Sequence, residues 1–133
     1  MGWTAGHSLV ADHFISDRVI IGGDAAHLFT PAGGLGYNTA VEDAVNLGWK
    51  LAAVLKGQGG RGLIESYEFE RQKVALRNTG YARGFADSVG NFVPEDNLEA
   101  NTENGELLRF AAGEYLVEHA KREFNIPGIT FGA

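Results

Sequence analysis

Hydrophobic positions recur at helical spacing over three stretches of the chain. The first stretch covers residues 35–56, and its apolar positions are Val41, Ala44, Val45, Gly48, Leu51, Ala52 and Leu55. The second covers residues 63–89, with one side made of Ile64, Tyr67, Arg71, Val74 and Ala75. The third is shorter and covers residues 106–124. Steps of three and four residues return to the same face of a helix, so the pattern predicts three helices.

The segments around these helices show other patterns. Residues 8–23 read as extended chain, and "RVIIGG" at residues 18–23 reads as a short buried strand bounded by glycine. The glycines of "KGQGGRG" end the first helix, because glycine accepts the left-handed conformation of a C-cap. Gly80 and Gly84 predict an irregular second half of the second helix, or its close packing against a neighbour. The polar residues 92–105 predict a loop.

The resulting fold class is an α-rich α/β fragment, in which one or two short strands feed two long helices and a third helix follows. A single strand buried by helices leaves unpaired edges, which natural proteins avoid. We therefore expect the chain to be part of a longer protein, in preference to a sheet completed by a second copy. We expect one domain over residues 1–92, and a loop and helix over residues 93–133 that lead toward a further domain.

Composition excludes several function classes. A net charge of −6 argues against nucleic acid as a partner, since a phosphate backbone requires a basic face. No apolar run reaches the roughly 20 residues of a membrane-spanning helix, so no membrane partner is expected. The absence of cysteine removes disulfides and thiolate chemistry, and no acidic or histidine cluster has metal-ligand spacing. A cytoplasmic location fits this composition.

The chemistry-bearing stretch is "GGDAAHLFTPAGGLG", between the predicted strand and the first helix. Asp24 follows the strand, at the edge where open α/β sheets bind their ligands. Pro31 makes the loop rigid, and the bare backbone of Gly33, Gly34 and Gly36 admits a ligand closely. The helix N-terminus that follows directs free N–H groups and a positive dipole end at the same space. Asn38 adds a polar side chain in the first turn.

These residues carry a family resemblance. Gly23–His27, then Pro31, the glycine turn with Leu35, Asn38, and Asp43–Leu51 resemble the second FAD-binding motif of the flavoprotein aromatic hydroxylases, the p-hydroxybenzoate hydroxylase and phenol hydroxylase group. Residues 63–72 are similar to the segment that follows in that family. The resemblance is dense over residues 10–75 and fades beyond residue 89.

The resemblance implies a function and a cofactor. Asp24 would hydrogen-bond a ribityl hydroxyl of FAD, and the backbone near Pro31 would lie beside the isoalloxazine ring. The residues that would place N–H groups at the N1 and C2 carbonyl edge are Gly34, Leu35, Gly36 and Asn38. The family reduces FAD with NADPH or NADH and transfers one oxygen atom of O₂ to a small aromatic substrate.

The sequence lacks two parts that the family carries, the dinucleotide-binding Gly-x-Gly-x-x-Gly fingerprint and the substrate-binding sheet. We therefore expect the chain to be a fragment of an FAD-dependent aromatic monooxygenase, inactive alone and weak in holding FAD. No catalytic residue is assigned within it. The substrate cannot be deduced, because the missing sheet builds most of the substrate pocket.

Structural roles compete with functional ones at several positions. His27 is expected to be a hydrogen-bonded structural group rather than a base. Glu42 and Asp43, placed in the first turns of the first helix, are expected to favour its dipole and so to have a structural role. Trp49 and Tyr67 are expected to pack in the core. Glu70 and Arg71 are expected to form an ion pair that anchors the two long helices.

Two alternative functions remain open. In one, the chain is a non-catalytic helical module that binds no cofactor and forms a homo-oligomer through an exposed apolar helical face. In the other, the flavin is kept but the chemistry differs, as in the related halogenases, epoxidases and reductases.

Overall fold

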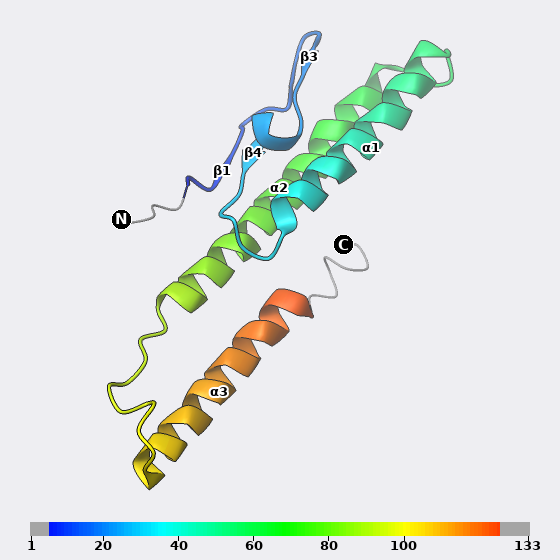
Figure 1. The fold of residues 1–133 in the computed structure, drawn as a ribbon. Coiled ribbons are helices and arrows are strands. Elements are labelled where there is room, and N and C mark those ends of the chain that lie inside the picture. Colours follow the sequence, from blue (N-terminus) through cyan, green and yellow to red (C-terminus); the bar gives the residue numbers. More distant parts are fainter. Residues whose placement is uncertain (1–5, 126–133) are drawn as a thin grey trace. The chain divides into compact units, whose positions relative to one another are not determined.

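The structure is a computed structural model that describes residues 6–125 of the 133-residue chain (Figure 1). It divides into two compact units, Met1–Arg83 and Gly84–Ala133, and the division falls inside a long helix. The elements are β1 (Leu9–Val10), β2 (Ile15–Ser16), β3 (Val19–Ile20), the 3₁₀ turn η1 (Gly23–Ala25), β4 (His27–Leu28), α1 (Leu35–Leu55), α2 (Arg61–Gly90) and α3 (Glu103–Phe124).

Short antiparallel pairs shape the N-terminal segment. β1 pairs with β4, with Leu9 opposite Leu28. β2 pairs with β3 through a tight hairpin whose Asp17 has a φ of 53°. Aspartate enters this left-handed region more readily than most residues. The described part of the chain is therefore helix-rich with a few short strands, as the predicted fold class requires, while the strand within residues 18–23 forms only a two-residue pair.

The helices α1 and α2 form an antiparallel hairpin. Lys50 of α1 bonds Glu70 of α2, whereas Thr39, nearer the start of α1, bonds Asn78, farther along α2. The predicted spans of both helices are confirmed to within two residues. The prediction of an irregular second half of α2 is wrong, because the helix runs unbroken to Gly90. A Cβ at Gly80 or Gly84 would meet no atom within 4 Å, so close packing does not explain these glycines either.

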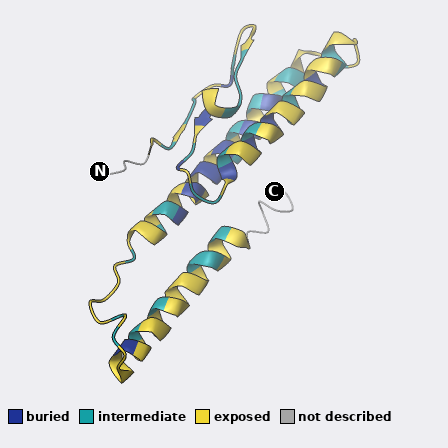
Figure 2. Cartoon of the chain, in the orientation of Figure 1, coloured by how far each residue is buried: buried dark blue, intermediate teal, exposed yellow. Residues whose placement is uncertain are grey.

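The core of the first unit lies where the N-terminal segment covers the α1–α2 hairpin, and Figure 2 shows the buried positions gathered there. Its buried hydrophobic cluster consists of Phe14, Ala26, Tyr67 and Ala75. The Tyr67 ring packs beside Phe14, with centroids 6.2 Å apart. The packing role predicted for Tyr67 is confirmed. The same prediction for Trp49 is wrong, because its side chain is 53% exposed on α1.

The apolar positions that predicted α1 do not face this core. All seven residues are exposed, and they form one stripe along the helix: Val41, Ala44, Val45, Gly48, Leu51, Ala52 and Leu55. The side of α1 that is buried against α2 instead carries Thr39, Asp43 and Lys50. This set of seven exposed residues is called the α1 stripe below.

The second unit holds the end of α2, a loop and α3. The loop predicted over residues 92–105 is confirmed up to Thr102, where α3 begins. The Thr102 hydroxyl accepts a hydrogen bond from the Gly105 amide, which caps the helix three residues earlier than predicted. Tyr115 of α3 donates a hydrogen bond to the Ser88 carbonyl oxygen at 2.5 Å. In the described residues no helix has the length and apolar character needed to cross a membrane.

Candidate functional site

A pocket of about 430 Å³ lies between the η1 turn, the loop after β4 and the start of α1. Five of the seven predicted cofactor-binding residues line it: Asp24, Pro31, Gly34, Leu35 and Gly36. Gly33 and Asn38 do not line it. The Asn38 side-chain amide instead donates to the Gly34 carbonyl oxygen at 2.8 Å, which ties the first turn of α1 together. The structure therefore brings the predicted carboxylate and the helix start to one concave space.

The start of α1 leaves its backbone donors available. Gly34 is the N-cap residue, with a φ of 64°, and no side chain caps the helix. The first turn contains no acidic residue. The uncapped N–H groups and the positive end of the helix dipole therefore remain free to bind an electron-rich group of a ligand.

The glycines of the pocket leave room for a ligand. A Cβ built on Gly34 would meet no atom within 4 Å, so the space beside this pocket-lining residue is open. Gly36 packs differently, because its Cβ would lie 3.4 Å from that of Phe29. Asp24 is exposed at the pocket, and its carboxylate has no hydrogen-bond or ion-pair partner among residues 6–125. An unpaired acceptor and open backbone at one pocket fit a ligand that offers hydroxyl donors and a flat ring edge.

Beneath the pocket, Asp43 forms the centre of a buried polar network. Its carboxylate accepts hydrogen bonds from the Gly23 amide at 3.0 Å, His27 Nε2 at 2.6 Å and Arg71 Nε at 2.7 Å. Burial raises the pKa of the Asp43 carboxyl, but the bonds from His27, Arg71 and Gly23 outweigh it and hold that pKa below its ordinary value. Asp43 is therefore a carboxylate at neutral pH.

Sequence reasoning missed this network. The structural role predicted for Glu42 and Asp43 is confirmed, because both carboxylates bond Arg71. The dipole reason given for it is wrong, because α1 begins at Leu35 and its first turn holds no acidic residue. Glu70 and Arg71 do not pair with one another. Glu70 bonds Lys50 at 2.7 Å, whereas Arg71 bonds Asp43 and, at 2.8 Å, Glu42. They do anchor the two long helices, but as two separate pairs.

The structural role predicted for His27 is confirmed. The ring is buried, donates to Asp43 and packs edge-on against Phe29, with centroids 5.2 Å apart. Its Nδ1 has no partner in the described residues. A signal for the network did exist in the sequence, since Thr39, Asp43 and Lys50 recur on one polar side of the predicted helix.

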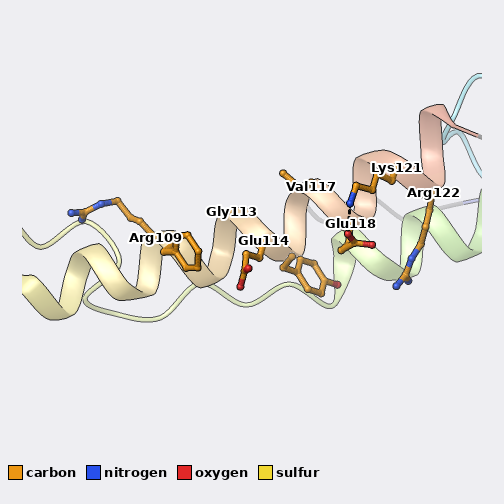
Figure 3. A pocket seen from close by; sticks show the side chains of 9 residues that line it. Arg109, Gly113, Glu114, Val117, Glu118, Lys121 and Arg122 are labelled. Carbon is orange, nitrogen blue, oxygen red and sulfur yellow. Dashed lines mark hydrogen bonds and ion pairs between the residues drawn. The ribbon is translucent and has the colours of Figure 1, made fainter.

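A larger pocket, of about 840 Å³, follows α3 and is lined by side chains of that helix alone, between Arg109 and Arg122 (Figure 3). Two of its lining residues, Lys121 and Glu118, form an ion pair in which Nζ and Oε1 lie 2.6 Å apart. None of the predicted site residues lies in it. The part of the chain that the structure describes contains no group of three or more histidine or acidic side chains that could hold a metal ion.

Comparison with known proteins decides the family. A family model described as an FAD binding domain matches residues 3–81. The chain belongs to this FAD-binding family. FAD is therefore the cofactor of the family, as the sequence predicted.

Similar proteins extend this result. The chain is 39% identical over 109 residues to the 3-(3-hydroxy-phenyl)propionate/3-hydroxycinnamic acid hydroxylase of Mycolicibacterium smegmatis, a match that covers 80% of the chain and 18% of the relative. It is 53% identical over 80 residues to the rifampicin monooxygenase of Rhodococcus hoagii, covering 60% of the chain and 17% of the relative. The chain thus spans less than a fifth of these relatives' length.

A solved structure matches the fold of this FAD-binding segment. The rebeccamycin biosynthetic enzyme RebC with reduced flavin superposes with a TM-score of 0.84 at 42% sequence identity. The match covers 94% of this chain and 24% of RebC. The short strands and long helices of this chain therefore match a segment of RebC, which was solved with reduced flavin.

Proposed function

We propose that the chain is the part of a flavin-dependent monooxygenase that holds the ribityl and isoalloxazine portions of FAD. In this proposal it is the C-terminal part of a Rossmann-like FAD-binding domain over residues 1–92, and residues 93–133 lead toward a further domain. The whole protein hydroxylates a small aromatic substrate with O₂ and NADPH or NADH. The single observation that carries the proposal is the pocket that Asp24 shares with the uncapped start of α1.

Each group of pocket residues contacts a different part of FAD in this proposal. Asp24 accepts hydrogen bonds from ribityl hydroxyls, since its exposed carboxylate has no partner among residues 6–125. The N–H groups at Gly34, Leu35 and Gly36 face the electron-rich edge of the ring, where the helix dipole stabilises negative charge. FAD, when bound, supplies the redox chemistry and the activation of O₂. Pro31 keeps the loop rigid, so that the backbone lies beside the ring without rearrangement.

Titration of FAD against the purified chain tests this role. Because the chain is expected to hold FAD only weakly, the titration is carried to high protein concentration, where we expect the chain to quench FAD fluorescence. Asp24→Ala is expected to weaken binding roughly tenfold, because a hydrogen bond to a charged group contributes about 1.5–3 kcal/mol. Asp12→Ala is the matched control: it removes an exposed aspartate from the same N-terminal segment, outside the pocket. Equal FAD affinities for Asp24→Ala and Asp12→Ala, or no quenching by the unmodified chain, would contradict the proposal.

A second candidate function rests on the α1 stripe. An exposed apolar helix face of this length drives association, so the chain is also a candidate for a helical module that forms a homo-oligomer without cofactor. The two candidates differ in absorbance. A yellow protein with flavin bands supports the first, and a colourless protein whose oligomer grows with concentration supports the second.

A further inference from the structure

The carboxylate of Asp43 connects three separate parts of the first unit. It accepts from the Gly23 amide of the η1 turn, from His27 in β4 and from Arg71 in α2. Asp43 is 1% exposed; its bonds to His27 and Arg71 are buried, and its bond to the Gly23 amide is part-buried. A buried charge is tolerated only when it is paired and hydrogen-bonded, and Asp43 meets this condition with three donors.

Arg71 is itself held in place. Its Nη2 donates to Glu42 at 2.8 Å and to the Thr39 carbonyl oxygen at 3.4 Å, while its Nε bonds Asp43. The planar guanidinium thus spans about one turn of α1 from one position on α2. A lysine could not make all of these contacts, because it carries a single point charge without the fork of donors.

The turn that Asp43 holds is confined on its other sides as well. A Cβ on Gly22 would lie 2.6 Å from the Tyr67 hydroxyl, and a Cβ on Gly23 would lie 3.3 Å from that of Ala40. Gly23 also has a φ of 58°, in the left-handed region. The backbone therefore passes close to both long helices here. Asp24 is the next residue, and it is exposed at the pocket.

We propose that Asp43, held by Arg71, is a positioning residue for the flavin: through the Gly23 amide it sets the direction in which Asp24 faces the pocket. The inference rests on the proposed function of that pocket. Asp43 does not line the pocket, so its effect on Asp24 passes through the turn at Gly23.

Glu68 provides an internal comparison. Its carboxylate also fixes the N-terminal segment to a helix, by accepting from the Phe14 amide at 2.6 Å and the Ile15 amide at 2.8 Å. It has no bond to the turn at Gly23. If FAD binding depends only on anchoring the N-terminal segment, substitution of either carboxylate should weaken it. If it depends on the direction of Asp24, only substitution of Asp43 should weaken it.

Asp43→Asn and Glu68→Gln are the test variants, each made in the 133-residue chain. The Gly23 amide and His27 share one carboxylate oxygen of Asp43, and Arg71 bonds the other. The NH₂ group of an asparagine therefore faces either that pair or Arg71, so Asp43→Asn either removes the bond to the turn directly or releases the Arg71 bond that holds the side chain. The first measurement is hydrogen exchange at three amides: Gly23, Ile15, and Ala11, which bonds the Ala26 carbonyl oxygen at 2.8 Å and serves as reference. The second is FAD affinity by fluorescence quenching.

We expect each variant to speed exchange mainly at a different amide, and only Asp43→Asn to weaken FAD binding. Asp43→Asn speeds exchange at Gly23 roughly tenfold more than at Ala11, and weakens FAD binding by a similar factor. In Glu68→Gln the amide oxygen can still accept from both amides but is a weaker acceptor than the carboxylate, so exchange at Ile15 rises by a smaller factor. Exchange at Gly23 changes by the same factor as at Ala11, and FAD affinity stays within about twofold. Should Asp43→Asn fail to fold, Arg71→Lys is measured in the same way, with a smaller change of the same sign at Gly23.

Two results would overturn the positioning role. One is exchange at Gly23 and Ala11 that rises by the same factor in Asp43→Asn, which indicates a general loss of stability. The other is equal FAD affinity for the two variants. If the unmodified chain does not quench FAD, the proposed function fails, and the amide pattern alone still decides whether Asp43 orients the turn.

Discussion

The hydroxyl of Tyr67 shows how single residues tie α2 to the segment that precedes the pocket. It is fully buried and donates to the Ile21 carbonyl oxygen at 2.9 Å. Burial, with the negative charge of Asp43, raises the pKa of Tyr67 from 10.0 to about 12. Because the unfolded chain ionises first, the stability from neutral Tyr67 is complete below about pH 10 and is lost as pH rises toward 12. We expect the free energy of unfolding, measured by urea denaturation, to fall across this window.

Tyr67→Phe isolates this contribution. The variant leaves the Ile21 carbonyl without its donor, so it is expected to be less stable at neutral pH by about 1–3 kcal/mol. It should also lose less stability than the unmodified chain between pH 10 and 12. Tyr37→Phe is the matched control, since Tyr37 is 80% exposed. An alkaline loss of the same size in the unmodified chain and in Tyr67→Phe would contradict the assignment.

The sequence was informative about single residues wherever a local pattern carried the information. The positions of Asp24 and the pocket glycines followed from their place between a strand and a helix start, and His27 was placed correctly as a structural group. The bonds of Asp43 and Arg71 could not be predicted in this way. The Gly23–Asp43 bond joins residues 20 positions apart, and the Asp43–Arg71 bond joins residues 28 positions apart. Neither helical spacing nor a dipole argument can identify such a partner.

At the scale of elements, periodicity predicted helices more reliably than it predicted their buried faces. The spacing of the apolar residues placed α1 correctly, yet those residues form the exposed α1 stripe. The opposite face is buried because its polar groups find partners on α2, as Lys50 does with Glu70. Burial therefore follows from which groups can be satisfied by a neighbour, and this depends on the tertiary arrangement.

Two glycine substitutions test the packing of these elements and should have opposite signs. At Gly80, inside α2, a Cβ would meet open space, so Gly80→Ala is expected to stabilise the chain by about 0.5–1 kcal/mol through helix propensity. At Gly22 a Cβ would lie 2.6 Å from the Tyr67 hydroxyl, so Gly22→Ala should destabilise it by about 1–3 kcal/mol. Urea denaturation of both variants measures the difference. Stabilisation by Gly22→Ala would show that the turn is not tightly packed.

At the scale of the whole molecule, two features of the first unit differ in how they can be predicted: the pocket at Asp24 and the exposed apolar α1 stripe. The pocket residues come from η1, the following loop and α1, all within 14 positions of one another from Asp24 to Tyr37. Such a pocket can be predicted from sequence because its lining residues are local. The α1 stripe is different, since its role depends on what covers it.

The α1 stripe is expected to make the isolated chain associate with a second copy. Val45 and Leu55 are 66% and 85% exposed on it, and burial of apolar area contributes about 25 cal/mol per Å². We expect sedimentation velocity to show an average mass that rises with protein concentration. Val45→Glu, alone or with Leu55→Glu, should shift this equilibrium toward the monomer, since a carboxylate in an apolar interface must give up its hydration.

A matched control separates the stripe from net charge. Val93→Glu makes the same substitution at a residue that is 81% exposed in the loop before α3, so it changes the charge of −6 by the same amount without touching the stripe. We expect it to associate like the unmodified chain. If Val93→Glu and Val45→Glu shifted the equilibrium toward the monomer equally, the added negative charge, and not the stripe, would control association. A monomer at every concentration in the unmodified chain would exclude the stripe as a self-association surface, and the flavin-binding role would then stand as the remaining candidate function.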